Sequence, residues 1–109
     1  MTREMTLAID CGGGGIKGSV VDERGTMMAP ARRVPTPYPL PPELLVETVV
    51  GLAKVLPPAT RVTMGMPGMI RHGVVIATPH YITRDGPRSR VLPELVERWD
   101  HFDMGRAIA

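Results

Sequence analysis

The sequence lacks several features that would place it in other classes of protein. Its one cysteine, Cys11, excludes an intrachain disulfide. No apolar run approaches the roughly 20 residues that a helix needs to cross a bilayer. The first five residues include Arg3 and Glu4 and do not contain the long apolar stretch of a signal peptide. Asparagine is absent altogether. We therefore expect a cytoplasmic protein with no membrane partner.

The charge of the chain is close to balanced. With 13 basic and 11 acidic side chains the formal net charge is +2, which is too small to indicate nucleic-acid binding. Residues 61–90 contain five arginines and one acid, Asp85. This stretch is either a solvated surface or a positive patch that attracts a nucleotide or polyphosphate. The 109 residues suit one domain or part of one, and the hydrophobic content of 43% excludes a wholly disordered chain.

Alternating apolar residues predict two strands near the N-terminus, residues 5–10 and 16–21, on either side of four glycines. Two such runs around a glycine loop predict a β-hairpin. Residues 26–34 predict a third strand, which Pro30 restricts to an edge or an irregular strand. Residues 35–42 contain five prolines and predict an extended connection.

An amphipathic helix is predicted for residues 42–56, because its apolar side chains share one face and a proline pair ends it. After this helix the patterns predict a strand, a tight hairpin, a basic loop, a short helix and a final capped helix: residues 61–66, 69–77, 78–91, 92–99 and the segment after Asp103. The order is β-β-β-α-β followed by more β, which is an α/β fold.

The most informative segment runs from Asp10 to Lys17 and contains four consecutive glycines, Gly12, Gly13, Gly14 and Gly15. Without Cβ atoms such a loop brings its N–H groups close to a ligand, and a concave set of N–H groups binds phosphates. Asp10 would then hold a hydrated Mg²⁺ beside those phosphates, and Lys17 would add positive charge. The alternative is a flexible hairpin turn chosen only for its shape, but such a turn needs about one or two glycines.

Two other glycine motifs fit less well. A P-loop needs Gly-Lys-Ser/Thr in direct succession at the start of a helix, whereas Ile16 separates Gly15 from Lys17. The string Gly13-x-Gly15-x-x-Gly18 matches the dinucleotide fingerprint, which also requires a helix after the loop and an acid about 20 residues later. A strand is predicted after the glycines, and residues 34–42 contain no acid. We read this match as chance.

Several segments together resemble the repressor/ORF/kinase (ROK) family of sugar kinases, which includes polyphosphate glucokinases. Residues 10–17 resemble the family's first phosphate motif. Residues 65–68, Gly-Met-Pro-Gly, are similar to its glycine-x-proline-glycine segment. Residues 78–80, Thr-Pro-His, lie where family members carry a threonine/alanine-proline-asparagine stretch near the sugar. Trp99, Phe102 and Asp103 resemble the tryptophan and aspartate that precede the family's next helix.

The resemblance implies that residues 1–109 form the N-terminal part of a ribonuclease-H-like (actin-like ATPase) domain with a mixed sheet, without the second lobe. It implies phosphoryl transfer from ATP or polyphosphate to glucose with the help of Mg²⁺. In this scheme Gly12 to Gly15 and Lys17 hold phosphate, and Asp10 holds the metal through water. The implied sugar contacts are Pro67, Gly68 and His80. A homodimer is implied for the full-length protein. A DNA-binding domain is not expected, because the glycine motif begins at residue 10.

Two departures from the family pattern bear on function. The fifth motif position is usually threonine, and here it is Gly14, which leaves the donor open between ATP and polyphosphate. The family's general base is an aspartate in an Asn-Asp motif, and this sequence has no asparagine. We therefore expect no catalytic residue and no kinase activity in this chain alone. The alternatives are a non-catalytic remnant that binds phosphate or a partner, and a kinase for another sugar such as an N-acetylhexosamine.

Overall fold

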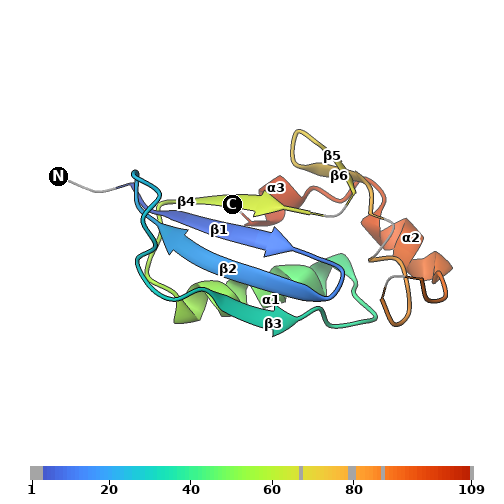
Figure 1. The fold of residues 1–109 in the computed structure, drawn as a ribbon. Helices are drawn as coiled ribbons and strands as arrows, with labels where there is room; N and C mark the ends of the chain where they lie inside the picture. The colour runs from blue at the N-terminus through green and yellow to red at the C-terminus, as the bar shows by residue number, and fades with distance from the viewer. Residues whose placement is uncertain (1–3, 67, 79–80, 87, 109) are drawn as a thin grey trace.

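A mixed four-stranded sheet forms the N-terminal half of the computed structural model, which describes residues 4–66, 68–78, 81–86 and 88–108 (Figure 1). The strands are β1 (Thr6–Cys11), β2 (Gly15–Val21), β3 (Arg32–Pro35) and β4 (Arg61–Gly65), in the order β3-β2-β1-β4. β2 pairs antiparallel with both β1 and β3, and β4 pairs parallel with β1. This sheet confirms the predicted α/β fold and its β-β-β-α-β order.

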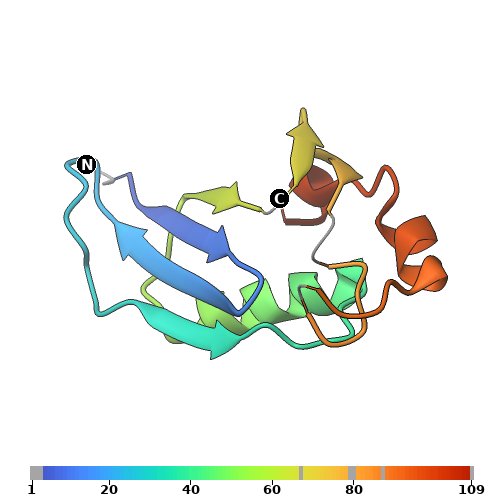
Figure 2. The same ribbon diagram turned by 45° about the vertical axis from the view of Figure 1, so that its right-hand side comes forward.

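One helix, α1 (Pro42–Val55), covers one face of the sheet (Figure 2). Its inward residues are Leu45, Val49 and Leu52, and they share a core with the inward residues of β1 and β2. The approach is close at Gly18, where an added Cβ would lie 3.2 Å from the Cδ1 atoms of Ile9 and Leu56. The predicted helix and its buried face are confirmed.

The C-terminal elements continue from the end of the sheet at which β1 ends, and the last of them turns back toward β4 (Figures 1 and 2). They are β5 (Met69–Arg71), β6 (Val74–Ala77), α2 (Pro93–Trp99) and α3 (Met104–Ile108). The β5–β6 hairpin turns at His72 and Gly73, whose φ angles are 50° and 80°, as in the turns that tight hairpins favour. Asp103 caps α3 as predicted, because its Oδ1 accepts from the Arg106 N–H at 3.0 Å.

A cluster of aromatic side chains joins these elements to the first half of the chain. The ring centroid of Trp99 lies 5.7 Å from that of Tyr81 and 5.9 Å from that of Phe102. The Trp99 indole N–H donates to the Leu40 carbonyl at 2.8 Å, and both Trp99 and Tyr81 are buried. No helix among the described residues is long and apolar enough to span a membrane.

The third strand is shorter than predicted, since it covers residues 32–35 instead of 26–34. The turn after β2 extends to Thr26, because the Asp22 carboxylate accepts from the N–H groups of Arg24 and Thr26 at 2.9 and 3.0 Å. Only an isolated bridge, between Val21 and Met27, follows this turn. Pro30 then has no N–H to donate to a ladder, so regular pairing resumes beyond it.

Candidate functional site

The glycine loop connects β1 to β2 at the end of the sheet nearest α2. The last cross-strand pair before the loop is Cys11 with Ile16, and the chain continues directly into β2. Because a strand and not a helix follows the glycines, the loop has neither P-loop nor dinucleotide-binding geometry. Gly14, at the tip, is exposed, and an added Cβ there would meet nothing within 4 Å. The tip is therefore open to a ligand.

All four carbonyl groups of the loop are held by hydrogen bonds from within the protein. The Gly12 carbonyl accepts from the Thr36 hydroxyl at 3.0 Å and from the Tyr81 hydroxyl at 2.9 Å. The Gly13 carbonyl accepts from the Tyr38 hydroxyl at 2.7 Å. The Gly14 carbonyl accepts from the Thr36 N–H at 3.3 Å, and the Gly15 carbonyl from the Gly12 N–H at 2.9 Å. The carbonyl oxygens, which carry the partial negative charge of these peptides, are thus all hydrogen-bonded within the protein.

The N–H groups of Gly13 and Gly14 are in the opposite situation. Within the described part of the chain, no backbone or side-chain acceptor is hydrogen-bonded to either group. The plane of a trans peptide directs its N–H away from its C=O, so these N–H groups point away from the side chains that hold the carbonyls. Two adjacent N–H groups without an acceptor among the described residues, beside the open position at Gly14, are an arrangement that binds anions.

A row of charged side chains crosses the open face of the sheet beside the loop. Asp10 of β1 is opposite Lys17 of β2, and Lys17 is opposite Arg33 of β3. All three side chains are exposed. Like charges directly opposite each other destabilise a sheet, and among the described residues neither Lys17 nor Arg33 forms an ion pair. An anion between them would relieve this repulsion.

Arg33 is a site residue that the sequence prediction missed. Its guanidinium lies against Gly15, so that a Cβ on Gly15 would overlap it. Its register opposite Lys17 depends on where β3 begins, which the predicted strand did not give correctly. The loop's tyrosine and threonine partners were also missed, since they come from residues 24 to 69 positions away in the sequence.

The Asp10 carboxylate is better suited to binding a hydrated magnesium ion than to a site in which the protein supplies all the metal ligands. Among the described residues there is no group of three or more His, Cys, Asp or Glu side chains that would hold a metal ion. Mg²⁺ commonly keeps several waters and is bound by one or two carboxylates together with substrate phosphates. A single exposed carboxylate beside the loop is consistent with that mode, and its β4 neighbour, Gly65, has no side chain to cover it.

The predicted sugar contacts are only partly described. Gly68 is exposed and has a φ of 135°, a conformation that glycine adopts readily. Pro67 and His80 lie outside the described residues.

Cys11 is buried next to the loop, and burial together with the Asp10 carboxylate raises the pKa of its thiol to about 11. It therefore behaves as a packed, protonated residue at neutral pH.

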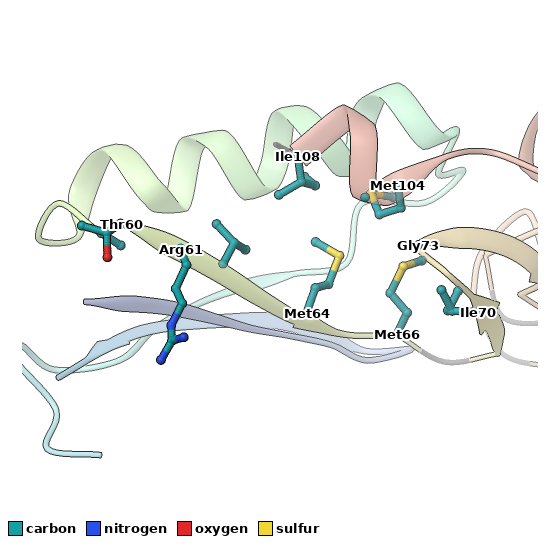
Figure 3. Close-up of a pocket in the computed structure, with 11 residues that line it drawn as sticks. Thr60, Arg61, Met64, Met66, Ile70, Gly73, Met104 and Ile108 are labelled. Carbon is teal, nitrogen blue, oxygen red and sulfur yellow. The ribbon is translucent and has the colours of Figure 1, made fainter. Parts of the chain in front are cut away.

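A separate groove of about 500 Å³ lies between β4, the β5–β6 turn and α3 (Figure 3). Its lining is largely apolar and includes Met64, Ile70, Met104 and Ile108. Arg61 at its rim is engaged by Thr6, to whose hydroxyl its Nε donates at 3.0 Å. Because the lining is mostly apolar and its one arginine is already engaged, we place the candidate phosphate site at the glycine loop.

The mixed sheet, with a glycine hairpin at its end and a helix across one face, is the class of fold predicted for the N-terminal part of an actin-like ATPase domain. Within that class the chain belongs to the ROK family, whose model matches residues 6–98. The match spans β1 to α2 and includes every element around the glycine loop. A comparison with curated proteins yields no match.

Solved structures of sugar kinases have the same fold. A ROK family glucokinase from Streptomyces griseus, in complex with glucose and AMPPNP, superimposes with a TM-score of 0.64 at 22% identity, over 95% of this chain and 29% of that one. A protein assigned as a sugar kinase from Cytophaga hutchinsonii gives 0.54 at 25% identity, over 87% and 31%. A protein assigned as an N-acetylmannosamine kinase from Listeria monocytogenes gives 0.57 at 19% identity, over 94% and 30%. The chain thus spans less than a third of the length of each.

Proposed function

We propose that the glycine loop of this chain binds the terminal phosphates of a phosphoryl donor, ATP or polyphosphate, as the donor-binding part of a kinase that phosphorylates glucose. The observation that carries this proposal is the orientation of the loop peptides. Their carbonyls are hydrogen-bonded inside the protein, while the Gly13 and Gly14 N–H groups have no acceptor among the described residues and Gly14 lies exposed at the tip. The AMPPNP in the Streptomyces griseus glucokinase supports ATP as a donor for this fold.

The charged row beside the loop supplies the rest of the donor site. Lys17 and Arg33 would neutralise phosphate oxygens, and Asp10 would hold Mg²⁺ through water. The metal would supply charge neutralisation of the donor phosphates. Gly68, with Pro67 and His80, would contact the sugar.

Phosphoryl transfer itself needs groups that this sequence does not contain. The resemblance gives an aspartate in an Asn-Asp motif as the base that accepts the proton of the sugar hydroxyl, and the chain has no asparagine. We therefore expect the 109-residue chain to give no glucose 6-phosphate above the blank in a coupled assay, with either ATP or polyphosphate. Turnover above the blank would contradict this part of the proposal.

Donor binding is tested by amide NMR on the ¹⁵N-labelled chain, titrated with Mg²⁺-AMPPNP and, separately, with tripolyphosphate. The Gly13 and Gly14 signals should move and saturate, whereas that of Gly25, in the remote turn after β2, should stay in place. Lys17→Met should weaken binding about tenfold, because a hydrogen bond to a charged group is removed. Lys54→Met, a loss of the same charge in the last turn of α1, is the matched control. Unmoved glycine signals with both probes would overturn the proposal.

A further inference from the structure

We propose that Tyr38 and Tyr81, the two tyrosines of the sequence, are positioning residues that fix the direction in which the glycine-loop amides point. This inference rests on the proposed function, because those amides are the groups assigned to phosphate. Neither tyrosine belongs to the motifs that carry the family resemblance. Each acts through the loop peptide that it holds, and not by contact with the donor.

The argument begins with the pairing of atoms within each peptide unit. The carbonyl of Gly13 and the N–H of Gly14 belong to one planar peptide, and Tyr38 donates to that carbonyl at 2.7 Å. The carbonyl of Gly12 and the N–H of Gly13 belong to the preceding peptide, which Tyr81 holds at 2.9 Å. A tyrosine that keeps the carbonyl inward therefore keeps the N–H outward.

Such restraint is needed because the loop has no side chains of its own to set its conformation. Glycine populates regions of φ and ψ that other residues avoid, so a peptide between two glycines rotates with little steric cost. Rotation of the Gly13–Gly14 peptide would turn the Gly14 N–H toward the protein and expose a carbonyl to the phosphate. It would also break the Tyr38 hydrogen bond, which is the only one made to the Gly13 carbonyl by a described residue.

The tyrosines are themselves held in place by packing. Tyr81 is fully buried, with its ring centroid 5.7 Å from that of Trp99 and 6.4 Å from that of Tyr38. Burial raises the pKa of both phenols, so both remain protonated donors at physiological pH. Tyr81 also follows His80 directly in the sequence, so its hydrogen bond ties the segment assigned to the sugar to the loop assigned to the donor.

The two hydroxyl groups are not equivalent, and this difference makes the inference testable. The Gly12 carbonyl retains the Thr36 hydroxyl, at 3.0 Å, when the Tyr81 hydroxyl is removed. The Gly13 carbonyl retains no described donor when the Tyr38 hydroxyl is removed. Tyr38→Phe should therefore impair phosphate binding more than Tyr81→Phe, although Tyr81 is the more buried residue. A purely structural role would give the reverse order.

The experiment compares the wild-type chain with Tyr38→Phe and Tyr81→Phe by amide NMR during titration with tripolyphosphate at fixed Mg²⁺. Tyr38→Phe should weaken binding about threefold to tenfold and reduce the shift at Gly14, whereas Tyr81→Phe should have a smaller effect, centred on Gly13. Thr48→Val is the matched control, because it deletes a hydroxyl that donates within α1 at 2.7 Å. Midpoints of thermal unfolding, measured for each variant, report the structural effect separately.

The possible outcomes separate this inference from the proposed function. If the wild-type glycine amides respond to tripolyphosphate and both phenylalanine variants bind as tightly, the positioning role is wrong and the proposed function stands. If binding falls only in proportion to thermal stability, with Tyr81→Phe the weaker binder, the positioning role is also wrong. If the wild-type amides do not respond at all, the proposed function fails and takes this inference with it. Should Tyr81→Phe fail to fold, Tyr38→Phe alone decides.

Discussion

A side chain at the tip of the glycine loop tests both the geometry of the site and its function. Gly14 is exposed, its φ lies outside the left-handed region, and an added Cβ would meet nothing within 4 Å. Gly14→Ala should therefore fold without strain and lower the entropy of the unfolded chain. The expected gain is about 0.4–1 kcal/mol, or an increase of roughly 2–8 °C in the midpoint of thermal unfolding.

The same substitution at Gly18 is the control for this prediction. Gly18 is buried under α1, and its Cβ would lie 3.2 Å from the Cδ1 atoms of Ile9 and Leu56. Gly18→Ala should therefore cost about 1–3 kcal/mol through overpacking. A loss of stability in Gly14→Ala comparable to that in Gly18→Ala would show that the loop tip is not open.

Gly14→Thr extends the test from geometry to function. Threonine is the usual residue at this position in the family that the motif resembles, and its hydroxyl would reach a phosphate held by the neighbouring amides. A hydrogen bond to a charged group contributes about 1.5–3 kcal/mol, so Gly14→Thr should bind tripolyphosphate at least about tenfold more tightly than Gly14→Ala. Calorimetric titration of both variants measures the ratio. Equal affinities would mean that phosphate does not approach this side of the loop.

Two further predictions concern Cys11 and Trp99, which are buried near the glycine loop and in the adjoining aromatic cluster. Cys11 should not react with a thiol reagent at neutral pH until the protein unfolds. The pKa of its thiol in the folded state, about 11, lies above the ordinary value of 9.0. Its contribution to the free energy of unfolding should therefore be complete below pH 9 and lost as the pH rises toward 11. Urea unfolding of wild type and Cys11→Ala across that range checks the sign, since a pH dependence that survives in Cys11→Ala has another source. Trp99→Phe should cost about 1–3 kcal/mol, because the buried Leu40 carbonyl loses its donor. Trp99→Ala should cost about 3–5 kcal/mol, and equal losses in the two variants would assign the whole effect to that hydrogen bond.

Most of the fold could be predicted because short-range patterns determine it. The alternation in β1, the stripe of apolar residues on α1 and the cap at Asp103 each depend on residues a few positions apart. The start of β3 could not be predicted in this way. It depends on how the Asp22 carboxylate extends the preceding turn, which is a choice between hydrogen bonds and not a pattern of hydrophobicity.

The candidate site was predictable only in its central segment. The run of glycines is visible in the sequence, but the residues that orient its peptides are 24, 25 and 69 positions distant from the carbonyls that they hold. Arg33 likewise reaches the loop only through the register of β3 against β2. Local propensity carries no information on such pairings, because tertiary packing decides them.

The structure also accounts for glycine at both ends of this loop, which contains four glycines where a hairpin turn needs about two. None of the four has the positive φ that makes glycine necessary in a tight turn, so the shape of the turn is not the reason. A Cβ on Gly12 would lie 3.1 Å from the oxygen of the Gly15 carbonyl, which is a tight contact with the hydrogen bond that closes the base of the loop. A Cβ on Gly15 would displace the Arg33 guanidinium, whereas one on Gly14 would meet nothing within 4 Å. Gly12 and Gly15 therefore allow close approach, by the loop's own backbone and by a cation. A loop selected for flexibility alone would not need its carbonyls held by three side chains.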